Sequence, residues 1–373
     1  MNKVVALINL HTSPELGLLT EKRPLASTTF LGRYAFIDIV LSNLTNSGID
    51  DIGILVKERY RSIIKHIGNE NTYLQNSKTG FLNFFINEKG SLNPTFNTDL
   101  NNIKENDYFL FDKHVEYVLI APTEIIMTYD YKNLISEHIK SGKKISVLYG
   151  TGKNSNGTYN GLSSIVVDPL NNIQKIDPID KDSDEELNIS LKSYIINKDF
   201  LKEILDKFSN ISQIFNISDM VLYITKYFEK VNAVKFEGKF LYFNTFKKYY
   251  DYSFKVLDQG ISLTDPLVPD WVIFTTTHNT RPVLFGPKSK VENSIVSNGC
   301  QIDGTVKRSI LSRNVVVEEG ATVEDSIIFT NCYVKAGVTL KNVVSDKHVK
   351  FVNKKEIAGT SSEPIYIPQG AKL

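Results

Sequence analysis

The residues best placed to do chemistry lie in one polar loop near the start of the chain, residues 9–25, NLHTSPELGLLTEKRPL. The loop follows residues 4–8, an apolar run too short for a helix and rich in β-branched types, which predicts a buried strand. In an open α/β sheet, the loop after such a strand lies at the carboxyl edge, where phosphates bind. This loop lacks the closely spaced glycines that let backbone N–H groups approach a phosphate.

Five side chains of this loop carry charge or can exchange a proton, among them His11, Lys22 and Arg23. His11 suggests acid–base chemistry. No nucleophile or carboxylate partner for it can be named from the sequence, so a structural role is favoured. Lys22 and Arg23 form a basic pair, for which an anion or interface site and a solvated loop are equally good interpretations.

Alternating strands and helices must position this loop. Apolar residues recur at helical spacing from Phe36 to Leu44, Gly48 follows as a cap, and residues 52–56 predict a second buried strand. The alternation predicts an α/β domain with a mostly parallel sheet over residues 1–258. Its later strands are expected at 115–121, 145–149, 162–167, 173–176 and 231–236, with 162–167 and 173–176 forming a hairpin. Its later helices are expected at 131–141, closed by Gly142, at 220–230 and at 246–258, and residues 192–205 predict a strand that runs into a helix.

The C-terminal part has a different pattern. Residues 259–290 contain prolines and little periodicity, which predicts a linker. From Ile295 to Val338, within a second predicted domain at 291–373, small apolar residues recur about every six positions with glycines at the corners. Short β-branched strands with this hexapeptide period are typical of a left-handed parallel β-helix.

Composition excludes several classes of protein. The formal net charge is +1, so no overall field attracts nucleic acid or a membrane surface. Two cysteines do not make a disulfide framework. We find neither a signal peptide nor an apolar run long enough to span a bilayer, so the expected location is cytoplasmic.

Three segments resemble the signatures of a known family: GRYAFIDIVLSNLTNSGIDDIGIL (32–55), VLIAPTEIIMTYDY (118–131) and NSIVSNGCQIDGTVKRSILSRNVVV (293–317). The family is that of the ADP-glucose pyrophosphorylases (glucose-1-phosphate adenylyltransferases), and the likeness covers nearly the whole chain. It implies a Rossmann-like nucleotidyltransferase domain followed by a left-handed β-helix. Active members make ADP-glucose and diphosphate from ATP and glucose 1-phosphate for glycogen or starch synthesis.

The chain departs from this family where the chemistry takes place. Active members have LAGGxGxRL after the first strand, whereas this chain has INLHTSPEL. A carboxylate repels a triphosphate, and side chains at glycine positions block its approach to the backbone. The degenerate positions are Leu10, His11 and Ser13 for the glycines, Glu15 for the arginine, Leu25 and Asp177 for two lysines, Glu124 for one metal-binding aspartate, and the neighbourhood of Phe243 for the other.

Other matches to the family keep their chemical character. The resemblance implies that Lys22 and Arg23 match a basic pair that contacts an anionic sugar-phosphate activator in some members. Arg33 matches a family lysine, and Ser190 falls at a sugar-contact position. We therefore expect no catalytic residue, no metal ligand and no required cofactor; Mg²⁺ enters only if the chain is active.

Three hypotheses follow. The first is a GlgD-type regulatory subunit, a noncatalytic or weakly catalytic pseudoenzyme that adjusts the activity or allosteric response of a catalytic GlgC-type partner. A heterotetramer is the assembly that the family implies. The second is an active glucose-1-phosphate adenylyltransferase that uses Glu124 with Mg²⁺. The third is a sugar-phosphate sensor that acts alone.

Overall fold

The computed structural model describes residues 4–68, 72–74, 80–88, 93–111, 115–212, 214–259 and 271–373. The described chain divides into two compact units: residues 4–13, 37–244 and 271–274 form the first unit, and residues 14–36, 245–259 and 275–373 form the second. The sequence predicted continuous domains, whereas these units interleave along the chain. Residues 260–270, within the predicted linker, lie outside the described residues.

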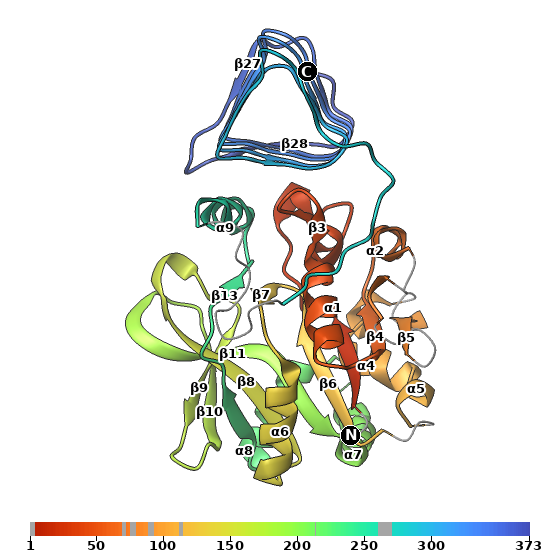
Figure 1. The fold of residues 1–373 in the computed structure, drawn as a ribbon. Coiled ribbons are helices and arrows are strands. Elements are labelled where there is room, and N and C mark those ends of the chain that lie inside the picture. The colour runs from red at the N-terminus through yellow and green to blue at the C-terminus, as the bar shows by residue number, and fades with distance from the viewer. Residues whose placement is uncertain are drawn as a thin grey trace. The chain divides into compact units, whose positions relative to one another are not determined.

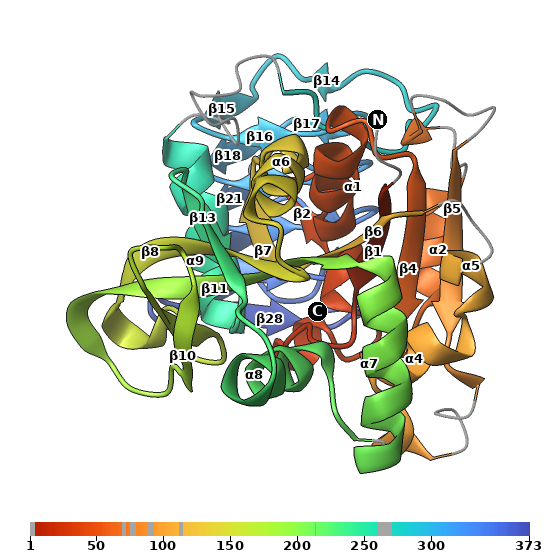
Figure 2. The same cartoon turned by 90° about the horizontal axis from the view of Figure 1, so that it is seen from below.

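The first unit is built on a sheet whose central strand is β1 (Val4–Asn9). It pairs in parallel with β4 (Asp51–Val56) and with β6 (Tyr117–Pro122). Strand β5 (Phe81–Ile86) continues the parallel part beyond β4, as Figure 2 shows. The predicted α/β fold is confirmed, and the loop after β1 does lie at the carboxyl end of a central parallel strand.

The other half of this sheet contains antiparallel pairs. Strand β11 (Ser183–Asn197) runs antiparallel to β6 and to β8 (Ile145–Asn154). Strands β9 (Ser163–Val167) and β10 (Ile173–Pro178) form the predicted hairpin, and β12 (Asn232–Lys235) pairs in parallel with β8. A separate short pair joins β7 and β13 beside the carboxyl end of β6. These two strands are Ile125–Met127 and Phe240–Tyr242.

Helices cover this sheet (Figure 2). Helix α6 ends at Gly142, whose φ of +64° is the left-handed conformation that glycine adopts readily, as predicted. Among the described helices, none combines the length and the apolar character needed to cross a membrane. The α-helices are α1 (Phe36–Asn46), α2 (Arg61–Ile67), α4 (Asp99–Glu105), α5 (Tyr108–Phe111), α6 (Tyr131–Ser141), α7 (Lys198–Ile211), α8 (Ile217–Tyr227) and, in the second unit, α9 (Phe246–Asp258).

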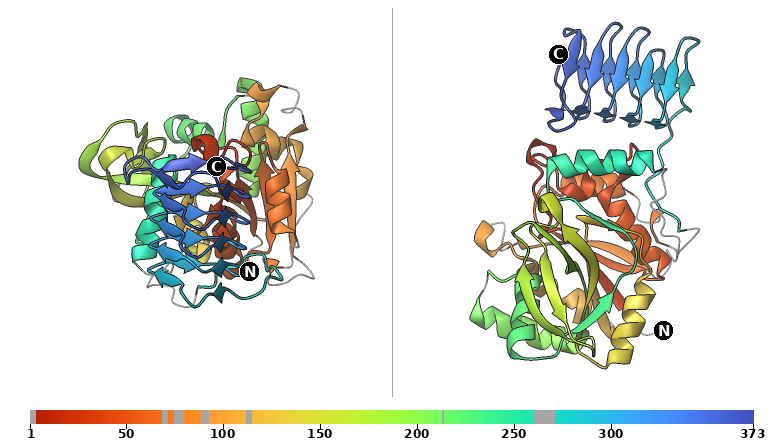
Figure 3. Two further views of the ribbon diagram at one scale, coloured as in Figure 1. Left: turned by 90° about the horizontal axis from the view of Figure 1, so that it is seen from above. Right: turned by 90° about the vertical axis from the view of Figure 1, so that its left-hand side faces the viewer.

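The second unit contains a solenoid of three parallel five-stranded sheets, which Figure 1 shows end on as a triangle and Figure 3 shows from the side. The predicted left-handed β-helix is confirmed. The first sheet is β14 (Leu284–Phe285), β17 (Gln301–Ile302), β20 (Val316–Val317), β23 (Tyr333–Val334) and β26 (Lys350–Phe351). The second is β15 (Lys290–Glu292), β18 (Thr305–Lys307), β21 (Thr322–Glu324), β24 (Thr339–Lys341) and β27 (Glu356–Ala358). The third is β16 (Ile295–Val296), β19 (Ile310–Leu311), β22 (Ile327–Ile328), β25 (Val343–Ser345) and β28 (Ile365–Ile367).

Helix α9 joins residues 14–36 to the solenoid within the second unit. The Tyr249 hydroxyl donates to the backbone oxygen of Thr29 at 2.7 Å. The next hydroxyl, that of Tyr250, donates to the backbone oxygen of Asp325 at 2.7 Å. Because buried hydroxyls need partners, these bonds fix the helix between the two segments. Residues 14–36 include the short hairpin of β2 (Thr29–Phe30) and β3 (Tyr34–Ala35).

Candidate functional site

The site expected at the carboxyl edge of the sheet is organised around Glu124, which follows β6. Its side chain is fully buried, with 0% exposure. The Glu124 backbone oxygen accepts a hydrogen bond from Phe243 N at 3.0 Å, so the β13 segment is held next to it. A buried carboxylate needs hydrogen bonds or a counter-charge to be stable.

Four donors from this chain surround the Glu124 carboxylate. Oε1 accepts from Thr12 Oγ1 at 3.1 Å and from Lys192 Nζ at 3.1 Å. Oε2 accepts from the backbone N of Thr123 at 3.2 Å and from Ser13 Oγ at 3.4 Å. Two carboxylate oxygens offer about four lone-pair sites in total, so the acceptor capacity of Glu124 is used within the chain.

Lys192 reaches Glu124 from an irregular point in β11. The pairing of β11 with β8 shifts register between Ser190 and Tyr194, and Lys192 lies in this bulge with a φ of +49°. Its ammonium also lies 5.9 Å from the centre of the Tyr242 ring. Burial, with a smaller contribution from the Glu124 charge, raises the pKa of Tyr242 well above its usual range.

Lys192 and Tyr242 were not predicted from the sequence as site residues. A lysine within the buried run around residues 189–196 was a usable signal, because lysine is rarely buried unless paired. Ser190 itself is 7% exposed and lies on β11 close to Lys192 in the chain.

Leu10 and His11, in the first part of the loop, form their contacts within the first unit. Leu10 is buried, and its N–H donates to Leu55 O at 3.1 Å, which prolongs the β1–β4 pairing. His11 lies 3.2 Å from Asn97 O through Nδ1 and 3.0 Å from Asn102 Nδ2 through Nε2. Burial lowers the pKa of His11 to about 4. A neutral ring that donates from Nδ1 satisfies both contacts, which matches the structural role favoured for His11.

Comparison with known proteins gives the family. Residues 16–251 match the Nucleotidyl transferase family. The chain belongs to this family. Residues 284–363 also match the family described as GlmU-like, C-terminal hexapeptide, which agrees with the solenoid.

Curated relatives resemble this chain over most of their own length. The glucose-1-phosphate adenylyltransferase of Fervidobacterium nodosum is 28% identical, over 92% of this chain and 83% of the relative. The enzyme of that name from Bacillus cereus strain ZK is 26% identical, over 88% of this chain and 87% of the relative. The glycogen biosynthesis protein GlgD of Bacillus subtilis is 25% identical, over 99% of this chain and 96% of the relative. The resemblance to ADP-glucose pyrophosphorylases and to GlgD is therefore confirmed.

The residues around Glu124 do not fit the Mg²⁺ that the family implies. Mg²⁺ requires near-ideal octahedral oxygen ligands, whereas the Glu124 oxygens already accept four hydrogen bonds, one from an ammonium. Phe243, near the second metal position, is fully buried and apolar. Within the described part of the chain, no group of three or more histidine, cysteine, aspartate or glutamate side chains is arranged to hold a metal ion.

In the second unit, the predicted effector residues have different environments. Lys22 and Arg33 are exposed, and the Arg33 guanidinium lies 5.3 Å from the centre of the Tyr34 ring. Arg23 is only 5% exposed and pairs with Asp346 of the solenoid, with Nη2 and Oδ2 2.5 Å apart. Arg23 is thus not a solvated loop residue. Its guanidinium is buried against Asp346 and is not open to a ligand from solvent.

Two more of the degenerate positions, Glu15 and Leu25, lie in the second unit and form no part of a binding site. Glu15 is exposed, and Leu25 is buried in a short 3₁₀ helix, Leu25–Ser27. In the first unit, Asp177 forms an ion pair with Lys175 at 2.7 Å on β10. Exposure to solvent, burial in a 3₁₀ helix and a local ion pair therefore account for these three side chains.

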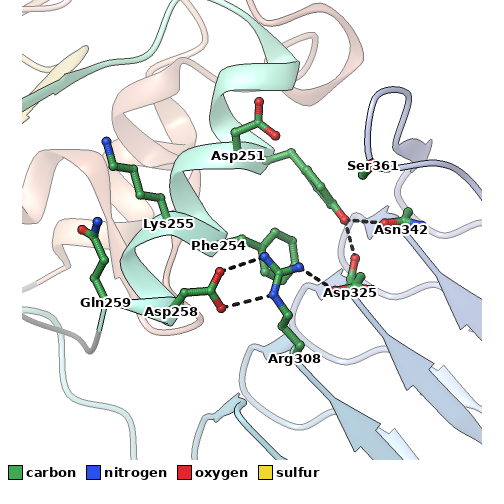
Figure 4. Close-up of a pocket in the computed structure, with 10 residues that line it drawn as sticks. Asp251, Phe254, Lys255, Asp258, Gln259, Arg308, Asp325, Asn342 and Ser361 are labelled. Atoms are coloured by element: carbon green, nitrogen blue, oxygen red, sulfur yellow. Dashed lines mark hydrogen bonds and ion pairs between the residues drawn. The ribbon is translucent and has the colours of Figure 1, made fainter.

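A cavity of about 440 Å³ lies within the second unit, between α9 and the solenoid. Figure 4 shows Arg308 between Asp258 and Asp325 at its wall. The Arg308 guanidinium also lies 4.7 Å from the centre of the Phe254 ring. Arg308 of the solenoid thus bridges a carboxylate of α9 and a carboxylate of the solenoid, so these contacts fasten α9 to the solenoid.

Proposed function

We propose that this chain is a noncatalytic, GlgD-type subunit of glucose-1-phosphate adenylyltransferase in glycogen biosynthesis. It would regulate a catalytic GlgC-type partner that makes ADP-glucose and diphosphate from ATP and glucose 1-phosphate, in a heterotetramer. The observation that carries this proposal is the Glu124 carboxylate, which is occupied by Thr12, Ser13, Thr123 N and Lys192. The likeness to GlgD over 99% of the chain supports the same assignment.

The physical reason is that this reaction depends on cationic stabilisation of the phosphates. Phosphoryl-transfer chemistry is achieved by positioning and by charges aimed at the phosphate oxygens. Leu10, His11 and Ser13 replace glycines that would admit a triphosphate, and Glu124 is already paired with a cation. Loss of one such stabilising contact lowers the rate by about 10²–10³. Several losses together support a modulating role in place of catalysis.

The proposal predicts a clear result in an ADP-glucose synthesis assay with Mg²⁺. The chain alone is expected to form ADP-glucose at least about 10⁴-fold more slowly than a catalytic subunit, because two or more contacts are lost. Added to the catalytic subunit, it is expected to raise the rate or change the effector response. The control is the same amount of heat-denatured chain.

Two outcomes of this assay contradict the proposal. Ordinary turnover by the chain alone would favour the active enzyme that uses Glu124 with Mg²⁺. An unchanged partner, together with saturable sugar-phosphate binding to the chain alone, would favour the sensor.

The proposal also includes an anionic sugar-phosphate effector that contacts Lys22 and Arg33, which are exposed. Lys22→Ala is expected to raise the effector concentration needed for half-maximal response of the mixed assembly by roughly tenfold, because a charge-assisted hydrogen bond is lost. Arg33→Ala is expected to act in the same direction. Lys132→Ala, at an exposed lysine on α6, is the control. An unaltered effector response in both variants would remove the effector from the proposal.

A further inference from the structure

We infer that the Lys192 ammonium is a built-in counter-cation for Glu124, which takes the place of a divalent metal ion and makes the site independent of metal. The inference deepens the proposed function, since it explains how a chain without catalysis keeps a buried carboxylate at the former metal position. Its test uses this chain alone.

The first support is the burial of the charge. Glu124 is 0% exposed, and the side chain of Lys192 is 15% exposed, with Nζ and Oε1 3.1 Å apart. A buried carboxylate without a compensating cation is strongly unfavourable. Within the described part of the chain, Lys192 is the cation that forms an ion pair with this carboxylate. A metal ion would therefore have to displace Lys192.

The second support is the backbone that delivers Lys192. A φ of +49° is uncommon for a residue with a side chain, and such strain persists where the surroundings impose it. The bulge in β11 turns this side chain toward the carboxyl edge of the sheet, which is a recognised effect of bulges next to functional sites. The ion pair with Glu124 is the contact that compensates the strain.

The third support is that the loop takes part in the same arrangement. Thr12 and Ser13 donate to Glu124, and Ser13 Oγ also lies 2.9 Å from Thr123 Oγ1. The residues that follow β1 are thus bonded to a site already neutralised by Lys192. The same bonds hold Thr12 and Ser13 against the carboxyl edge of the sheet without a metal ion.

The test compares five forms of the full chain: wild type, Glu124→Gln, Lys192→Met, Lys192→Gly, and the double variant Lys192→Met with Glu124→Gln. The readouts are the thermal midpoint with and without Mn²⁺, and the Mn²⁺ electron paramagnetic resonance signal. Wild type is expected to show no shift with Mn²⁺. Lys192→Met removes the cation at similar length and is expected to lower the midpoint by roughly 5–10 °C.

Mn²⁺ is expected to restore part of that loss in Lys192→Met, because a ligand that binds the folded state raises its stability. The double variant is expected not to respond to Mn²⁺. Lys192→Gly also frees the carboxylate but relaxes the backbone, so it carries the same metal test if the methionine variant does not fold.

Two results overturn the inference. One is binding of Mn²⁺ by the wild type that is lost in Glu124→Gln. The other is absence of any Mn²⁺ response in both single Lys192 variants. Failure here is distinguishable from failure of the proposed function. An inactive chain that binds Mn²⁺ through Glu124 contradicts only this inference, whereas ADP-glucose turnover contradicts the regulatory role.

Discussion

Replacement of Arg23 by methionine is expected to lower the free energy of unfolding of the second unit by about 3–5 kcal/mol, because it breaks a buried ion pair from one side. Asp346 is 2% exposed and would lose the guanidinium that lies 2.5 Å from its Oδ2. The Tyr366 hydroxyl, which donates to the same oxygen at 2.6 Å, supplies no charge to replace it. Denaturant unfolding followed by circular dichroism measures the effect.

Lys22 provides a matched control because it is the neighbouring basic residue and is exposed. Lys22→Met is expected to change stability by no more than about 0.5 kcal/mol. Adding Asp346→Leu to Arg23→Met is expected to recover much of the loss, since an apolar pair can replace a buried ion pair. Equal stability of the Arg23 and Lys22 single variants would show that the ion pair contributes nothing.

This contact also explains why two interpretations of Arg23 were equally good before the structure was known. Its partner Asp346 is 323 residues away in the chain, and no local pattern connects them. The family resemblance pointed to an anion near Arg23, and the structure supplies one from the solenoid itself. Because removal of Arg23 is expected to lower stability, variants of Lys22 and Arg33 are the proper probes of an effector.

The fold was more accessible to sequence reasoning than the site, because periodicity reports burial directly. The apolar run that predicted β1 forms a strand with parallel neighbours on both sides, as its uninterrupted apolar character indicated. The hexapeptide period predicted the solenoid for the same reason. Neither pattern contains information about which polar side chains meet.

The ion pair between Lys192 and Glu124 could not be predicted from the sequence. The Lys192 side chain reaches Glu124 only because a register shift in β11 gives the backbone a positive φ. The family comparison located Glu124 as a degenerate metal position, but the cation that neutralises it depends on this bulge. A functional assignment from substitutions alone would have described a lost metal site and overlooked the ammonium there.

The first sheet of the solenoid offers a matched pair of phenylalanines. Phe285 on β14 and Phe351 on β26 occupy equivalent positions in the first and the last strand of this sheet. The strands between them carry Ile302, Val317 and Val334 at that position. Phe351 is fully buried, whereas Phe285 is 53% exposed. Hexapeptide periodicity assigns both to the same face, and both strands are at an end of their sheet, so the residues that cover each ring distinguish them.

Phe351→Ala is therefore expected to destabilise the second unit by about 3–5 kcal/mol, because it removes a buried ring and leaves a cavity. Phe285→Ala is expected to cost less than about 1 kcal/mol, since the ring at the exposed end already contacts water. The C-terminal residues account for part of the contrast: Leu373 packs against the solenoid core, and its backbone bonds with Lys350 in the strand that carries Phe351. Denaturant unfolding of both variants measures the difference. Equal losses of stability in the two variants would contradict the argument that burial of the Phe351 ring sets its larger contribution.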